Sequence, residues 1–215
     1  MLRRPFGTSS QSRQKINAHQ SMKIILATHN PHKRDELLTL AGNSIEIELL
    51  PDDFPEIPET GNTLEENAHI KAQFVFDKLH QPALADDTGL EVEALSGAPG
   101  VYTARYAGEN ATYKDNCHKL LHELDGINNR NAKFTTVICF IDKSGAESLF
   151  TGSVDGKITK DFRGTNGFGY DPIFEPIEGN GKTFAEMTPE KKNSISHRAR
   201  AMGNFLDSIN SSESF

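Results

Sequence analysis

Residues 23–40 read KIILATHNPHKRDELLTL and contain the pattern that decides the fold. The isoleucine-rich apolar run Lys23–Thr28 predicts a short buried strand. A polar turn, His29–Lys33, follows it, and the leucines from Lys33 to Leu40 recur at helical spacing, with Gly42 as the stop signal. Strand, loop and helix in this order form the building unit of an α/β protein.

The next elements continue this alternation. Ile45–Leu49 alternates like a second strand, and the acidic, proline-rich segment Pro51–Pro58 predicts a surface loop. Thr63 and Glu66 form a capping box, which predicts a helix from this point to about Leu79.

The second half of the chain predicts a hairpin between helices. Phe134–Ile141, FTTVICFI, is a clear strand, and Glu147–Val154 is expected to pair with it across a short turn. Ala111–Leu124 and Asn193–Ile209 have helical periodicity. Because hairpin and crossover connections coexist, we expect one α/β domain: a mixed, elongated sheet flanked by helices, with two lobes around a central cleft.

Composition narrows the class of protein. The chain has 215 residues, 36% of them hydrophobic, which is enough for a substantial core. No apolar stretch is long enough to span a bilayer and none resembles a secretory signal, so we expect a cytoplasmic protein without a membrane partner. The two cysteines, Cys117 and Cys139, match neither a disulfide scaffold nor a zinc spacing, and we interpret both as buried hydrophobic residues.

Charge is distributed unevenly. Residues 1–21 carry four basic side chains and no acidic one, which leaves 19 basic against 30 acidic residues in the remainder. The acidic remainder argues against nucleic-acid binding. Met22 directly precedes the first strand, so we interpret 1–21 as a disordered or non-native extension rather than a targeting segment, and 22–215 as the functional domain.

Two adjacent carboxylates stand in the segment ADDTGL, residues 85–90. We expect Asp86 and Asp87 to lie in a tight turn with Thr88 and Gly89. Like charges this close repel each other, so the turn must be either solvated or built around a divalent metal. Glu59 is a further acidic candidate, and loop carboxylates of this kind suit Mg²⁺.

Two further segments could bind an anion. The loop Thr28–Lys33 precedes a helix, whose free N–H groups and dipole favour phosphate, with Lys33 supplying a full charge. The alternative is an ordinary polar turn in which Asn30 bonds its own backbone. His197 and Arg198 are expected in the first turn of the last helix, where cations oppose the helix dipole unless a ligand compensates.

An aromatic loop follows the glycine-rich segment Gly164–Gly167. Phe168 and Tyr170 could sandwich a planar base, although aromatic residues more often belong to a core. The glycines flanking Phe168 would be wasteful in a core strand, so we keep both interpretations.

Taken in order, these segments strongly resemble the inosine triphosphate pyrophosphatase family, also called dITP/XTP pyrophosphatases. The resemblance covers Lys23 to about Ile209 and rests on LATHNPHK, ETGNTLEENA, ADDTGLEV, GFGYDPIF and SISHRA. It implies hydrolysis of ITP, dITP and XTP to the monophosphate and pyrophosphate, a Mg²⁺ cofactor, and a homodimer that binds a purine nucleoside triphosphate.

The resemblance also implies roles for individual residues. Asp87 is the expected proton acceptor, and it shares the metal with Glu59. The expected substrate contacts are Thr28, His29, Asn30, Pro31, His32 and Lys33 at the triphosphate, Thr88, Lys192, the base loop Phe168, Gly169, Tyr170 and Asp171, and the purine-reading pair His197 and Arg198.

Two alternatives remain at this stage. A related pyrophosphatase acting on pyrimidine or modified nucleotides would share the architecture, although GFGYDP and SHR argue against it. A nucleotide-sensing protein without turnover would keep the base loop and Lys33. It would not need both Glu59 and Asp87.

Overall fold

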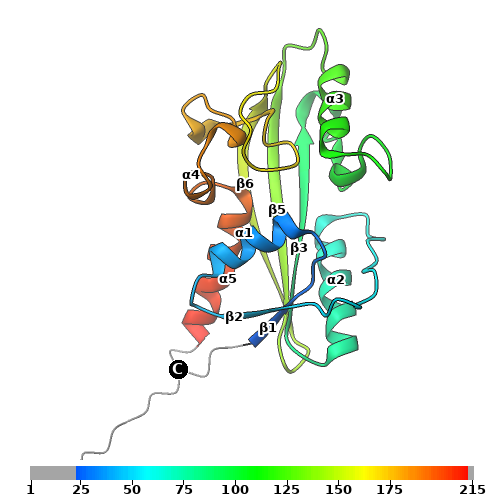
Figure 1. The fold of residues 1–215 in the computed structure, drawn as a ribbon, viewed down its shortest axis with the longest axis vertical. Coiled ribbons are helices and arrows are strands. Elements are labelled where there is room, and N and C mark those ends of the chain that lie inside the picture. The colour runs from blue at the N-terminus through cyan, green and yellow to red at the C-terminus, as the bar shows by residue number, and fades with distance from the viewer. Residues whose placement is uncertain (1–22, 213–215) are drawn as a thin grey trace, which may run out of the picture.

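The computed structural model describes residues 23–212, which form a seven-stranded mixed sheet flanked by helices (Figure 1). The strands are β1 (Lys23–Leu26), β2 (Glu46–Leu49), β3 (Ala83–Val92), β4 (Pro99–Gly100), β5 (Asn131–Ile141), β6 (Glu147–Ile158) and β7 (Phe174–Pro176). The sheet order is β2-β1-β3-β5-β6-β7, with β4 paired to β3. The β1 strand is parallel to both its neighbours, whereas β3, β5, β6 and β7 pair antiparallel, which confirms the expected mixed α/β sheet.

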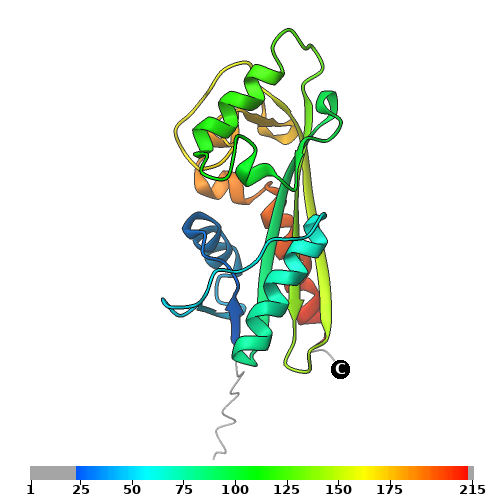
Figure 2. The same cartoon turned by 90° about the vertical axis from the view of Figure 1, so that its right-hand side faces the viewer.

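The helices are α1 (Pro31–Ala41), α2 (Leu64–Leu79), α3 (Tyr113–Glu123), α4 (Pro189–Asn193) and α5 (His197–Ser212). Four single 3₁₀ turns join them: η1 (Glu93–Leu95), η2 (Thr103–Arg105), η3 (Ile177–Gly179) and η4 (Phe184–Glu186). The long strands β3, β5 and β6 run through the whole molecule, with α1, α2 and α5 around one half and α3 and α4 around the other (Figures 1 and 2). These strands therefore join the two lobes into one body.

Alternation along β5 explains how the sheet is covered on both faces. Val137, Cys139 and Ile141 point to the α2 face, whereas Ile138 and Phe140 point to the face covered by α1 and α5. A strand that is apolar at consecutive positions must be buried on both sides. No helix within residues 23–212 is long and apolar enough to cross a membrane.

Several sequence predictions are confirmed in detail. The Thr63 hydroxyl caps α2 by accepting the Glu66 N–H, and β5 and β6 form the expected hairpin. The helix α1 begins at Pro31, two residues before the predicted start, because proline suits the first helical position. The last helix is not continuous: α4 ends at Asn193 and α5 begins at His197.

One prediction is wrong. Asp86, Asp87, Thr88 and Gly89 do not form a turn but lie in the middle of β3, paired to Ile138, Val137, Thr136 and Thr135 of β5. Adjacent charges and a glycine favour a turn when only local sequence is considered. Here each carboxylate meets its own cations on a different face of the sheet. The predicted extension 1–21 lies outside the described residues.

Candidate active site

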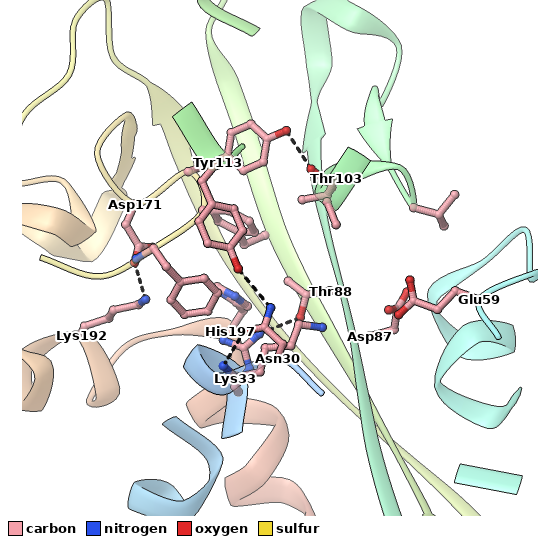
Figure 3. Close-up of a pocket in the computed structure, with 17 residues that line it drawn as sticks. Asn30, Lys33, Glu59, Asp87, Thr88, Thr103, Tyr113, Asp171, Lys192 and His197 are labelled. Carbon is pink, nitrogen blue, oxygen red and sulfur yellow. Dashed lines mark hydrogen bonds and ion pairs between the residues drawn. The ribbon is translucent and has the colours of Figure 1, made fainter. Parts of the chain in front are cut away.

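A cleft opens where the two lobes meet, and most of the predicted site residues line it (Figure 3). Figure 3 shows Glu59 and Asp87 together at one end of this cleft and Asp171 and Lys192 at the other. Twelve of the predicted residues line the cleft: Asn30, Lys33, Glu59, Asp87, Thr88, Phe168, Gly169, Tyr170, Asp171, Lys192, His197 and Arg198.

The other predicted contacts lie around the cleft. Thr28 and His29 line an adjoining hollow beside Glu59, and His32 lines a hollow behind Phe168. Pro31 lines none of these hollows and serves as the first residue of α1.

The loop between β1 and α1 combines the two interpretations of its sequence. The Asn30 side chain accepts hydrogen bonds from the N–H groups of His32 and Lys33, so it caps the helix as an ordinary turn would. Its amide nitrogen donates to the Tyr113 hydroxyl across the cleft, at 3.1 Å. Lys33 nevertheless reaches the cleft, where burial lowers the pKa of its amine and the charges of Lys71 and Arg198 add to this effect.

Asp86 belongs to a closed ionic network on the α1 and α5 face. Arg198 donates to its Oδ2 through Nε at 3.2 Å and Nη2 at 3.1 Å, and the Lys33 amine lies 3.4 Å from the same oxygen. Burial alone would raise the pKa of Asp86, but the charges of Lys33 and Arg198 outweigh it and hold that pKa well below its usual range. Asp86 therefore stays an anion.

Asp87 faces the opposite side, toward α2, and opens to the cleft. The Lys71 amine donates to Asp87 Oδ1 at 2.6 Å and to Glu59 Oε1 at 2.9 Å, so one cation joins the two carboxylates. Burial raises the pKa of Asp87, although Lys71 and Lys33 oppose the rise. A buried carboxylate with a raised pKa is a better proton acceptor than a free one.

The residues Glu59 and Asp87 fit a hard divalent cation. Their carboxylate oxygens converge on one point, which the Lys71 amine marks, and Mg²⁺ prefers oxygen ligands of this kind. Both side chains line the cleft, so water molecules and phosphate oxygens could complete the coordination.

A second network lies at the end of the cleft opposite Glu59 and Asp87 (Figure 3). The Lys192 amine donates to Glu36 Oε1 at 2.7 Å and to Asp171 Oδ2 at 2.6 Å, and Glu36 also accepts from Arg198. The Phe168 ring lies among these groups, stacked on His32 with ring centroids 5.0 Å apart and with the Lys192 amine 4.9 Å from its centre. The network thus holds an aromatic ring at the cleft wall.

His197 and Tyr170 have different surroundings from Phe168. His197 stacks on Phe134, and burial holds the pKa of its imidazole well below 6.5, so the ring is neutral. Its Nδ1 has no hydrogen-bond partner among residues 23–212, although the side chain lines the cleft. The Tyr170 ring is packed in the core beside Phe134, and its hydroxyl donates to the Thr103 carbonyl, so Tyr170 is a core residue, whereas Phe168 stands at the cleft wall with its ring stacked on His32.

Sequence reasoning missed Lys71 and Glu36. Both lie in helices that were predicted, where charged side chains are normally solvated. A usable signal existed: Ala68, Lys71, Ala72 and Val75 follow the i, i+3, i+4, i+7 spacing of an apolar stripe, and all four are buried. A lysine inside such a stripe needs a buried partner.

The fold and the cleft together define a class of protein: a two-lobed α/β protein in which a cationic strand-to-helix loop, two carboxylates and an aromatic loop face one cavity. The chain belongs to the Ham1 family, which matches residues 24–208. This confirms the relationship expected from the sequence.

Its relatives support the same assignment. The dITP/XTP pyrophosphatase of Thermoanaerobacter sp. strain X514 is 51% identical over 186 residues, covering 84% of this chain and 93% of the relative. The dITP/XTP pyrophosphatase of Flavobacterium johnsoniae is 48% identical over 188 residues, covering 86% and 97%. Among solved structures, the Staphylococcus aureus Ham1 protein matches with a TM-score of 0.79 and 37% identity, over 88% of this chain and 99% of that one.

Proposed function

We propose that this protein hydrolyses noncanonical purine nucleoside triphosphates, ITP, dITP and XTP, to the monophosphate and pyrophosphate, with Mg²⁺ as cofactor. The observation that supports this most directly is the pairing of Asp87 and Glu59 through Lys71 at the cleft, beside Lys33. The names of the relatives point to two of these substrates, dITP and XTP.

The reaction requires water to attack the α-phosphorus. Asp87 would accept the proton of that water. Glu59 and Asp87 would hold the Mg²⁺, which neutralises phosphate charge and acidifies bound water. Lys33 and Lys71 would stabilise the leaving pyrophosphate, and an anion beside Lys33 would favour its charged form, which burial disfavours.

Base selectivity would depend on the atom at position six of the purine. Hypoxanthine and xanthine present a carbonyl there, whereas adenine presents an amino group. The donors of Arg198 are already engaged by Asp86, Glu36 and Thr88, so the neutral His197 imidazole, which lines the cleft and has one ring N–H, is the better candidate donor. Adenine would then place a donor against a donor, at a cost that discriminates strongly.

Three finer expectations belong to the same proposal. We infer a homodimer in the cytoplasm, on the resemblance stated above, and an extension 1–21 that is not needed for activity. Light scattering of the full chain measures the mass in solution. A chain starting at Met22 should keep the turnover of the full chain, and a large loss would show that the extension takes part.

One assay tests the function. Pyrophosphate release is measured with ITP, XTP, GTP, ATP and dUTP, each with Mg²⁺ and with a chelator. We expect turnover of ITP and XTP that needs Mg²⁺ and exceeds that of the other three. Preference for dUTP would favour a pyrimidine enzyme, and tight ITP binding without turnover would favour a sensor.

A further inference from the structure

Three metal-ligating side chains meet outside the cleft, on the α2 face of the sheet. They are His69 of α2, Cys139 of β5 and Glu147 at the start of β6. One imidazole nitrogen, the Sγ and one carboxylate oxygen all lie within 4.8 Å of one another. The His69 Nδ1 and a Glu147 oxygen are in direct contact. We propose that this cluster, the His69–Cys139–Glu147 site, binds a divalent transition metal of the Zn²⁺ class.

The donor set determines which metal class the site would take. A thiolate and an imidazole are soft or borderline ligands that select Zn²⁺ and its neighbours, whereas Mg²⁺ requires oxygen ligands. Tetrahedral coordination at the usual bond lengths separates ligand atoms by roughly 3.5 Å. Side-chain movements of roughly 1 Å would therefore fit the three atoms around an ion: the direct contact between His69 and Glu147 would open, and the longer separations in the cluster would shorten. The fourth position would be left for water.

Secondary structure, rather than a loop, positions the ligands. Ile141 pairs with Glu147 across the hairpin, and Cys139 lies two residues before Ile141 on the same face, so Cys139 and Glu147 are diagonal neighbours. The α2 helix packs on this face through Ala68 and Ala72, next to His69. The backbone therefore does not need to rearrange when the metal binds.

Burial differs among the three ligands in a way that suits metal entry. The Cys139 side chain is fully buried and forms the floor, whereas the side chains of His69 and Glu147 are 44% and 34% exposed. Burial and the Glu147 charge raise the pKa of the Cys139 thiol to about 12. A metal must displace this proton, so the affinity should increase with pH.

The site is separate from the proposed chemistry. None of its residues lines the cleft or the two hollows beside it. A bound ion would join α2 to the β5–β6 hairpin and would stabilise the folded state by mass action. Turnover with Mg²⁺ is therefore not the measurement that tests it.

Cobalt spectroscopy provides that test. The full chain, without a polyhistidine tag and freed of metal by a chelator, is titrated with Co²⁺. We expect one equivalent to produce a thiolate-to-cobalt charge-transfer band, which Zn²⁺ then abolishes by displacement. The variant C139A should lose the band. The variant C117A removes the other buried cysteine and should keep it.

Two further measurements exclude the possibility that C139A loses the band only because it does not fold. The exposed ligand is removed in H69Q, which should fold even if C139A does not, and its Co²⁺ affinity should fall by at least the roughly tenfold typical of an outer-shell loss. Zn²⁺ should raise the Tm of wild type and C117A but not of H69Q. A wild type without the band, a band retained in C139A, or equal Zn²⁺ stabilisation of H69Q would each overturn the proposal.

Discussion

The two faces of β3 hold neighbouring aspartates in opposite environments. Asp86 faces α1 and α5 and pairs with Arg198 and Lys33, whose charges hold the pKa of its carboxyl well below the usual range. Asp87 faces α2, meets Lys71 at the cleft, and its pKa is raised. One step along a strand turns a side chain to the other face, so adjacent residues need not share a function.

The difference follows from how completely each carboxylate is enclosed. Asp86 does not line the cleft, and its partner Arg198 is also bound by Glu36. Asp87 shares the amine of Lys71 with Glu59, and its side chain lines the cleft. We therefore assign a supporting role to Asp86 and the reactive role to Asp87, and the following experiments test this division.

The largest effect is expected from Asp87→Asn. Losing the proton acceptor and a metal ligand should lower ITP turnover by roughly 10²- to 10⁴-fold, while the remaining amide oxygen can still accept from Lys71, which also keeps Glu59 as its anion. Pyrophosphate release at saturating ITP measures the loss, and urea unfolding serves as the control for folding. Turnover close to that of wild type would remove Asp87 from the mechanism.

Asp86→Asn should act on stability. The change leaves the buried Arg198 with Glu36 as its one remaining carboxylate partner among the described residues and should lower the free energy of unfolding by about 3 kcal/mol in urea at pH 7. Because the pKa of Asp86 is depressed, its contribution is complete above the unfolded carboxyl pKa and is lost as pH falls toward the folded one. Wild-type stability should therefore fall more steeply than the variant's below about pH 4.

An unchanged unfolding midpoint in Asp86→Asn would show that the closed network contributes little. A turnover loss as large as that of Asp87→Asn, in protein that remains folded, would abolish the distinction between the two faces.

His197→Phe tests the same division at the start of α5, where Arg198 belongs to the ionic network and its neighbour His197 does not. Arg198 is engaged by Asp86 and Glu36, whereas the His197 imidazole lines the cleft and its Nδ1 has no partner among the described residues. Phenylalanine keeps the stacking on Phe134 and removes the ring nitrogens. The ratio of kcat/KM for ITP over ATP should narrow by about tenfold. If the ratio is unchanged, another residue reads position six.

The smallest effect is expected from Lys71→Met. Removing the cation beside Asp87 raises the pKa of that carboxyl further, so the acid limb of kcat/KM against pH should move to higher pH. Arg105→Met, which removes a more distant cation 3.6 Å from the other oxygen of Glu59, should leave the limb in place. A shift to lower pH would contradict the assigned direction.

The sequence predicted the elements better than the contacts between them. The run KIILAT, the Thr63 cap and the FTTVICFI hairpin were all recovered, because periodicity and caps are local properties. The interpretation of Asp86–Gly89 as a turn was wrong, since the charges that neutralise a strand aspartate come from helices distant in sequence. Sequence reasoning missed Lys71 and Glu36 for the same reason.

The cysteines illustrate the same limit. Their spacing excludes a zinc motif, and both are buried as expected, yet Cys139 lies beside His69 and Glu147, which come from two other elements. Motif spacing finds ligands that are near one another in the chain. It does not find ligands that a sheet and a helix bring together.

The sequence by itself determined the α/β class, the positions of the strands and helices, and the ordered motifs that relate the chain to its family. Tertiary structure decided which charge meets which: Asp86 with Arg198, Asp87 with Lys71, and His69 with Glu147. The physical reason is range. Helix and strand preferences act over a few residues, whereas ionic pairing and burial depend on distance in space, which only the packed sheet and helices establish.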